Sequence, residues 1–187
     1  MTQQELSTLI QSSVAYAASN LHLDMSGYRI IVNDWTSRGI NHCGINAETK
    51  IIACNIIWIN ECLAQGDNYD IPYLIMHEVR HHYQHQQIEN NKNGKPISES
   101  RELVEKWEWE SKKENYIWND GTTEKESLNQ QQSVEVDANA FAALMMMKKT
   151  KVFQTRFHTD ADDVTTERLT ELIPIYAPEL IPLMSKE

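Results

Sequence analysis

Two histidines stand four residues apart in this chain, with a glutamate directly after the first, in the pattern His-Glu-x-x-His. On an α-helix each residue advances by about 100°, so His77 and His81 lie about 40° apart and Glu78 projects from the same side. Two imidazoles on one face can hold one metal ion while the carboxylate reaches a water bound to that ion. The spacing therefore predicts a zinc-binding helix with His77 and His81 as ligands and Glu78 as the catalytic carboxylate.

The residues around the motif favour a helix with an apolar back. When His77 is placed at the front, five apolar residues fall on the opposite arc: Ile71, Ile75, Met76, Val79 and Tyr83. Asp70 can cap the first amides, and Pro72 is tolerated in the first turn because its nitrogen needs no intrahelical partner there. The alternative is a chance match on a solvated helix, because His82 and His85 crowd the same segment.

A third protein ligand decides the class of zinc site, and the nearest candidates fail a spacing test. The longer motif His-Glu-x-x-His-x-x-Gly-x-x-His needs a glycine and a third histidine where this chain has Gln84 and Gln87. His85 lies on the ligand stripe, but it sits about 6 Å along the helix axis from His81, an awkward reach for a tetrahedral site. We therefore expect His85 to be solvated or to support the ligands.

A better candidate lies in the segment 133–147, which is rich in helix formers and apolar nearly all round, and so predicts a buried helix. A carboxylate is costly to bury there unless it is paired or bound to a metal. Glu135 is therefore a candidate ligand, and Asn139, one turn later, is a candidate to hold a ligand imidazole in orientation. The alternative is that Glu135 only caps the helix after Ser133, where a negative charge suits the dipole.

Together the two motifs resemble the ImmA/IrrE-type metallopeptidases, which are gluzincins. The second motif of that family commonly has the form Glu-x-Glu-Ala-Asn/Asp-x-Phe-Ala-x-x-Leu, and this chain has Glu135-Val136-Asp137-Ala138-Asn139-Ala140-Phe141-Ala142-Ala143-Leu144. The resemblance covers residues 28–147 in the order of elements. It implies a Zn²⁺ ion held by His77, His81 and Glu135, with Glu78 as the catalytic carboxylate.

Two departures from the family bear on function. The interval from His81 to Glu135 is longer than the family leads one to expect, which indicates an insertion or lid over residues 89–127. No helix-turn-helix DNA-binding module accompanies the motifs, which weakens the transfer of the family's role in cleaving repressors.

The size and charge of the chain limit its partners. With 187 residues it can build one domain, and we expect a single domain over residues 1–187. A net charge of -10 argues against a nucleic-acid surface. No apolar run reaches membrane-spanning length and the first residues lack a secretory signal, so we expect a cytoplasmic protein without a membrane partner. The expected partner is a protein or peptide substrate, with a regulatory protein as one candidate. The oligomeric state stays open.

Three cysteines, Cys43, Cys54 and Cys62, form an odd set without the Cys-x-x-Cys spacing. This argues against both a disulfide framework and a thiolate zinc site, so we expect reduced thiols. His42 beside Cys43 is the one pair that would suggest a second metal site or a cysteine nucleophile. Adjacent side chains on a strand point to opposite faces, which disfavours it.

The remaining patterns predict an α+β fold, and the resemblance implies that it is zincin-like, with a small, mostly antiparallel sheet packed on the HExxH helix and on the second, Glu-bearing buried helix. A capping box, Thr2 with Glu5, begins a first helix that runs to about residue 20. Strands are expected at 28–33, 40–45 and 50–55, helices at 56–64, 98–119 and 164–172, and a flexible connection at 121–132. In the 98–119 helix we expect Leu103 and Trp107 to be the anchors.

These features predict a zinc endopeptidase in which Glu78 takes a proton from the metal-bound water as that water attacks a peptide carbonyl. A donor for the oxyanion is also expected, and Tyr116, Arg156 and His158 are candidates that the sequence does not separate. The alternative, from another class, is a protein-binding module that keeps the zincin scaffold and turns over nothing. The presence of Glu78 favours the enzyme, because a structural zinc site has no need of this carboxylate.

Overall fold

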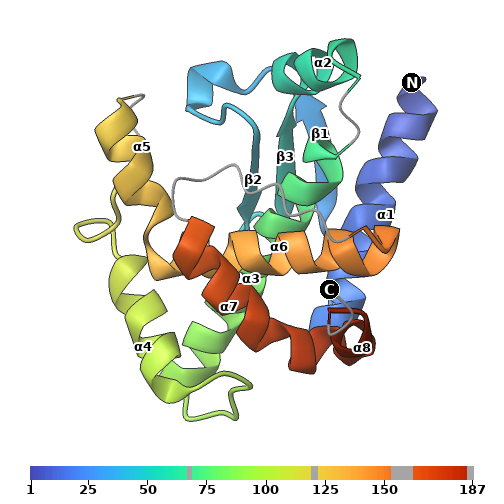
Figure 1. Ribbon diagram of the computed structural model, residues 1–187. Helices are drawn as coiled ribbons and strands as arrows, with labels where there is room; N and C mark the ends of the chain where they lie inside the picture. The colour runs from blue at the N-terminus through green and yellow to red at the C-terminus, as the bar shows by residue number, and fades with distance from the viewer. Residues whose placement is uncertain (67–68, 119–121, 153–161, 185–187) are drawn as a thin grey trace. The chain divides into compact units, whose positions relative to one another are not determined.

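The computed structural model describes residues 1–66, 69–118, 122–152 and 162–184 (Figure 1). It divides into two compact units, Met1–His82 and Tyr83–Glu187, and the division falls inside the long helix α3 (Asp70–Lys92). Helices and a small sheet together confirm the α+β class. That the whole chain acts as a single domain stays a prediction.

The first unit contains a three-stranded sheet of β1 (Arg29–Asn33), β2 (Cys43–Asn46) and β3 (Ile51–Asn55), in the order β1-β3-β2. β2 pairs with β3 antiparallel, whereas β1 pairs with β3 parallel, so the prediction of a mostly antiparallel sheet was wrong. The reason lies in the connections. A tight turn joins β2 to β3 and forces them antiparallel, but residues 34–50 between β1 and β3 are long enough for a parallel crossover.

Helix α1 (Gln3–Leu21) begins with the predicted capping box. The Thr2 amide donates to Glu5 Oε2 at 2.7 Å, and the Glu5 amide donates to Thr2 Oγ1 at 3.2 Å. Helix α2 (Ile56–Ala64) has the predicted bounds and is capped by Asn55, which accepts from the Ile57 amide at 3.0 Å. Figure 1 shows α1 on the side of the sheet where β1 lies, with β2 at the opposite edge.

Helix α3 carries Asp70 and, as predicted, Pro72 in its first turn, and it ends at Lys92. His77 is buried, and His85 is exposed, which confirms that His85 is solvated. The apolar back of the helix is buried at all five predicted positions: Ile71, Ile75, Met76, Val79 and Tyr83. The apolar back is therefore confirmed, and the metal-binding role of the histidines on the other face stays a prediction.

The second unit is helical over its described residues. It contains α4 (Arg101–Glu110), α5 (Thr123–Gln130), α6 (Ser133–Thr150), α7 (Asp162–Tyr176), the 3₁₀ turn η2 (Pro178–Leu180) and α8 (Ile181–Met184). Every residue of α6 from Val134 to Met147 is buried, which confirms the predicted buried helix. Within this unit α6 packs most extensively on α7 and also contacts α4 and α5.

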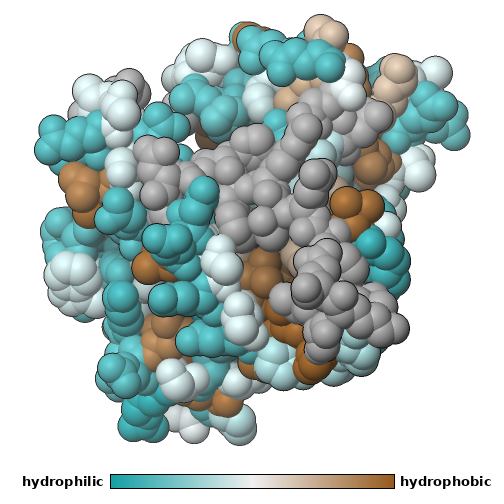
Figure 2. Space-filling model, in the orientation of Figure 1, coloured by the Kyte–Doolittle hydropathy of each residue, from teal (hydrophilic) through white to brown (hydrophobic). Residues whose placement is uncertain are grey.

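A flexible connection was predicted over 121–132, and among its described residues, 122–132, this was wrong, because α5 occupies most of them. Its first turn is capped by the Thr122 hydroxyl, which accepts from the Lys125 amide at 3.3 Å, a local signal that the prediction overlooked. The face of α4 and α5 in Figure 2 is mostly hydrophilic, and α5 buries no residue fully. That 89–127 forms a lid stays a prediction, and 119–121 lie outside the described residues.

One tryptophan anchors the charged segment before α5. Trp107 is 0% exposed, whereas Trp109 and Trp118 are 58% and 65% exposed. The predicted helix ends at Glu110 rather than near residue 119, and the fully buried neighbour of Trp107 is Val104, while Leu103 is half-buried. Trp107 is thus confirmed as an anchor, and Val104 takes the role that we assigned to Leu103.

The amino terminus of α6 is capped by a side chain from another helix. Gln132, at the N-cap position, makes no side-chain capping bond. Instead, Glu110 at the end of α4 accepts from the Ser133 hydroxyl at 2.6 Å and from the Val134 amide at 3.1 Å, both through Oε2. The first amides of a helix have no acceptor within the helix, so the buried Glu110 carboxylate supplies one. Its negative charge also complements the helix dipole.

We expect Glu110→Ala to lower the free energy of unfolding by about 1–2 kcal/mol, because it removes this cap. Glu108→Ala is the matched control. Glu108 lies on the same helix, and its ion pair with Lys92, at 4.0 Å, is partly exposed and should contribute less than about 1 kcal/mol. Urea denaturation followed by circular dichroism measures both variants, and equal losses would rule out the capping role.

Candidate metal centre

Two of the predicted ligands lie in the first unit, one turn apart on α3. The Nε2 atoms of His77 and His81 are 2.9 Å apart, and the ring centroids are 4.5 Å apart with the planes at 88°. Two nitrogens on one tetrahedral zinc ion would be about 3.3 Å apart, given Zn–N bonds of about 2.0–2.1 Å. A small movement of the rings would therefore let both nitrogens bind one ion. Glu78, which follows His77, is half-buried.

Glu135 lies in the second unit, in the first turn of α6, and is 9% exposed. The Tyr116 hydroxyl donates to Glu135 Oε1 at 2.7 Å. Asn129 Nδ2 in turn donates to the Tyr116 oxygen at 3.2 Å and to the Ile117 carbonyl at 2.7 Å. Because Asn129 donates to the phenol oxygen, the phenol proton points to the carboxylate. A carboxylate has two oxygens, so one can accept this bond while the other binds a metal ion.

Glu110 accepts the bonds from the Ser133 hydroxyl and the Val134 amide at the start of α6. Glu135 stands in the same first turn, so its role as a metal ligand stays a prediction. Among the His, Cys, Asp and Glu residues that the structure describes, one group could hold a metal ion. It consists of His77, His81 and Glu135, whose ligand atoms all lie within 4.8 Å of one another. The described cysteines form no such set, so the pairing of His42 with Cys43 gains no support as a metal site.

A second buried carboxylate of α6 supports the same turn. Asp137 is 1% exposed. Gln84 Nε2 donates to Asp137 Oδ2 at 2.7 Å and to the Val134 carbonyl at 2.9 Å. Asp137 Oδ1 accepts from Arg168 Nε at 2.8 Å. The first turn of α6 is therefore held by side chains of α3 and α7 within the second unit.

Arg168 continues this network. Its Nη2 lies 3.0 Å from Glu99 Oε2, and Glu99 Oε1 accepts from the Tyr83 hydroxyl at 3.1 Å. Burial by itself lowers the pKa of the Arg168 guanidinium, but the charge of Asp137, the hydrogen bond to Glu171 and the charge of Glu99 outweigh it, so its pKa is raised. The guanidinium therefore stays charged and balances the buried carboxylates.

Sequence reasoning missed several of these residues, although a signal was present for one of them. The cost of burying a carboxylate in an apolar helix, which singled out Glu135, applies equally to Asp137 two residues later. Gln84 was noted only as the residue that stands in place of a glycine. Glu110 and Arg168 carried no local signal, because their partners lie 24 and 31 residues along the chain.

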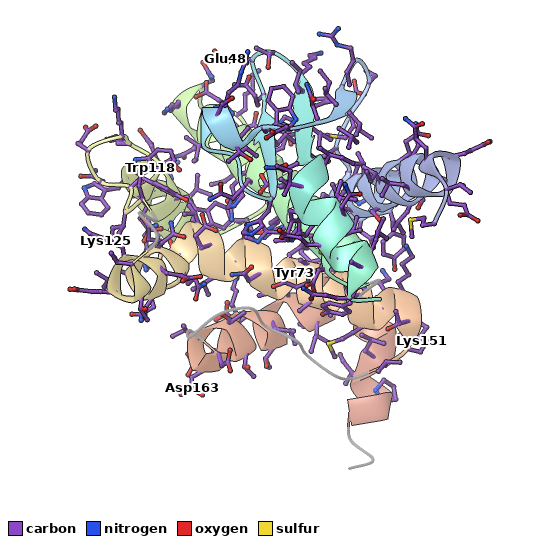
Figure 3. All side chains as sticks on the ribbon, turned by 90° about the horizontal axis from the view of Figure 1, so that it is seen from above. Glu48, Tyr73, Trp118, Lys125, Lys151 and Asp163 are labelled. Atoms are coloured by element: carbon purple, nitrogen blue, oxygen red, sulfur yellow. The ribbon has the colours of Figure 1, made fainter. Side chains whose placement is uncertain are left out.

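The other candidates divide into those the structure places and those it does not. Tyr116, one of three expected oxyanion donors, lies against Glu135, and its ring meets that of Trp118 with centroids 4.6 Å apart. Trp118 projects from the loop between α4 and α5 (Figure 3). Arg156 and His158 lie outside the described residues. Asn139 is buried, 9% exposed, and its role in orienting an imidazole stays a prediction.

The chain was compared with protein-family models, with curated proteins and with solved structures, and none of the three gave a match. The resemblance to ImmA/IrrE-type metallopeptidases therefore stays a prediction that rests on the two motifs. Among the described residues, no helix combines the length and the apolar character that crossing a membrane would require.

We expect Tyr116→Phe to weaken zinc binding about tenfold to a hundredfold, because the variant removes the hydrogen bond that orients the Glu135 carboxylate. Tyr28→Phe is a matched control: Tyr28 bonds to His82 at 3.1 Å, on α3 but outside the ligand group. Zinc affinity is measured by competition with a chelating dye. Equal affinities of the two variants would show that Tyr116 does not position the ligand.

Proposed function

We propose that this chain is a zinc-dependent endopeptidase with a zincin-like fold, similar to the ImmA/IrrE gluzincins. The proposed ligands are His77, His81 and Glu135, and Glu78 is the proposed general base. The observation that carries the proposal is the His-His-Glu group, whose ligand atoms lie within 4.8 Å of one another. Two neutral imidazoles and one carboxylate are a donor set that suits Zn²⁺ and leaves a fourth position open for water.

The surroundings of Glu135 support the ligand role. Gln84 lies three residues after His81 on the continuous helix α3, and it bonds to Val134 and Asp137, the neighbours of Glu135 in the first turn of α6. Within the second unit these bonds hold the first turn of α6, which carries Glu135. A ligand carried by a distant segment needs such a fixed support.

The proposed chemistry is peptide hydrolysis. Zinc, when bound, lowers the pKa of its water to about 7 and polarises the substrate carbonyl. Glu78 would accept the proton of that water and pass it to the leaving amine. Tyr116 would hold the Glu135 carboxylate in place, and Asn139 would orient a ligand imidazole. We propose a protein substrate in the cytoplasm, with a regulatory protein as one candidate.

The edge strand β2 is the proposed docking site for an extended substrate. β2 is an end strand in the order β1-β3-β2, and an extended peptide can add to such an edge through main-chain hydrogen bonds. Its residue Cys43 lies near enough to Glu78 for the carboxylate charge to act on the thiol. A peptide added at β2 would therefore pass close to the proposed general base.

A hydroxamate peptide inhibitor should slow hydrogen exchange of the β2 amides, because they would pair with the peptide backbone. β1, the other end strand, is the internal control and should exchange as before. Hydrogen–deuterium exchange with mass spectrometry measures both strands. Protection of β1 alone, or of neither strand, would remove β2 as the docking edge.

Metal binding and turnover separate the enzyme from a silent binding module. We expect the wild-type chain to bind one zinc ion and to cleave casein or a mixed peptide library. Glu78→Gln should keep the zinc ion and lose turnover by about 10²–10⁴-fold, because it removes the proton acceptor. His77→Ala and Glu135→Ala should lose the zinc ion. Bound metal is measured by atomic emission after dialysis, and cleavage by mass spectrometry.

His85→Ala is the control for these variants, since His85 is exposed on the same helix and should leave both zinc and turnover unchanged. Zinc binding without any cleavage by the wild type would favour the protein-binding module. A wild-type chain that takes up no zinc, or a Glu135→Ala variant that binds it normally, would overturn the proposed centre.

A further inference from the structure

Two cysteines face each other across the antiparallel pair β2–β3. Cys43 and Cys54 are direct partners in its register. The next pair along, His42 with Asn55, is a hydrogen-bonded pair, because the Asn55 amide donates to the His42 carbonyl at 2.7 Å. Hydrogen-bonded and non-hydrogen-bonded pairs alternate along an antiparallel ladder, so Cys43 and Cys54 form a non-hydrogen-bonded pair.

The geometry of such a pair suits a disulfide. The Cα atoms of a non-hydrogen-bonded pair are about 4.5 Å apart and the side chains leave the same face of the sheet, whereas disulfides span Cα distances of about 4.4–6.8 Å. The pair falls at the short end of this range, where strain makes a disulfide easier to reduce. In the structure all three cysteines are thiols.

The surroundings differ between the two thiols. Cys54 is 0% exposed, whereas Cys43 is half-buried, so an oxidant in solution reaches Cys43 first. The hydrogen bond with Cys54 raises the pKa of the Cys43 thiol most, and burial and the nearby charge of Glu78 raise it further. Little thiolate is therefore present at neutral pH, which keeps the pair reduced unless an oxidant persists.

We propose that Cys43 and Cys54 are an oxidative modification site that forms a reversible cross-strand disulfide with a peroxide as oxidant. The proposal does not rest on the peptidase function. It adds a redox-sensitive link between an edge strand and its neighbour, close to Glu78. Cys62, on α2, is not part of the pair.

The chemistry balances in two steps. The Cys43 sulfur attacks one oxygen of hydrogen peroxide, the O–O bond breaks, and a sulfenic acid forms while the other oxygen leaves as water with the thiol proton. The Cys54 sulfur then attacks the Cys43 sulfur, the S–O bond breaks, and a second water leaves with the Cys54 proton. The two thiols lose two electrons, and the peroxide gains them.

The test treats the full chain with hydrogen peroxide at mildly alkaline pH, removes the peroxide, and then alkylates the remaining thiols with N-ethylmaleimide in urea at neutral pH, because Cys54 and Cys62 are buried in the folded chain. Trypsin cleaves after Lys50 and separates Cys43 from Cys54, and a glutamate-specific protease cleaves after Glu61 and separates Cys54 from Cys62. Mass spectrometry without reduction then identifies every linked pair. We expect a Cys43–Cys54 link in most molecules, maleimide on Cys62, and loss of the link with dithiothreitol.

Two variants sharpen the result. Cys62→Ser should form the same link to the same extent, and Cys43→Ser should form none. Three outcomes would each overturn the proposal. The first is a link that includes Cys62, and the second is sulfinic acid on Cys43 without any linked peptide. The third is that all three thiols react with N-ethylmaleimide after unfolding.

Discussion

The burial of carboxylates at the start of one apolar helix is the constraint on which the rest of the structure depends. α6 is buried from Val134 to Met147, yet its first two turns contain two acidic residues, Glu135 and Asp137. An unpaired carboxylate in such a place costs several kcal/mol. Asp137 is paired with Gln84 and Arg168, and Glu135 accepts from Tyr116. The Glu110 carboxylate, from α4, accepts hydrogen bonds from the Ser133 hydroxyl and the Val134 amide at the start of α6.

These partners give the two acidic residues different uses. Asp137 is held by a cation and an amide, so its charge is balanced and serves to tie α3, α6 and α7 together. Glu135 accepts from the Tyr116 phenol, which orients its carboxylate. An oriented carboxylate suits the ligand role that we propose for Glu135 in the zinc centre.

Much of the local structure follows from short sequence signals. The capping box at Thr2, the bounds of α2 and the apolar back of α3 come from contacts within a few residues, which propensity and periodicity describe well. The parallel pairing of β1 with β3 does not follow in this way, because strand direction depends on the path of the connection. α5 was missed because a short polar helix lacks the apolar period.

The sequence alone determined which side chains of α3 could hold a metal ion, because the spacing of His77 and His81 on a helix is set by the helical repeat. The sequence also singled out Glu135, because burying a carboxylate in an apolar helix is costly unless it is paired or bound to a metal. Only the tertiary structure decided which residues support that carboxylate and which one caps the helix. Tyr116, Glu110 and Arg168 reach α6 from other segments. The opposition of Cys43 and Cys54 likewise depends on the register of two strands, since hydrogen bonding between separate segments has no local trace in the sequence.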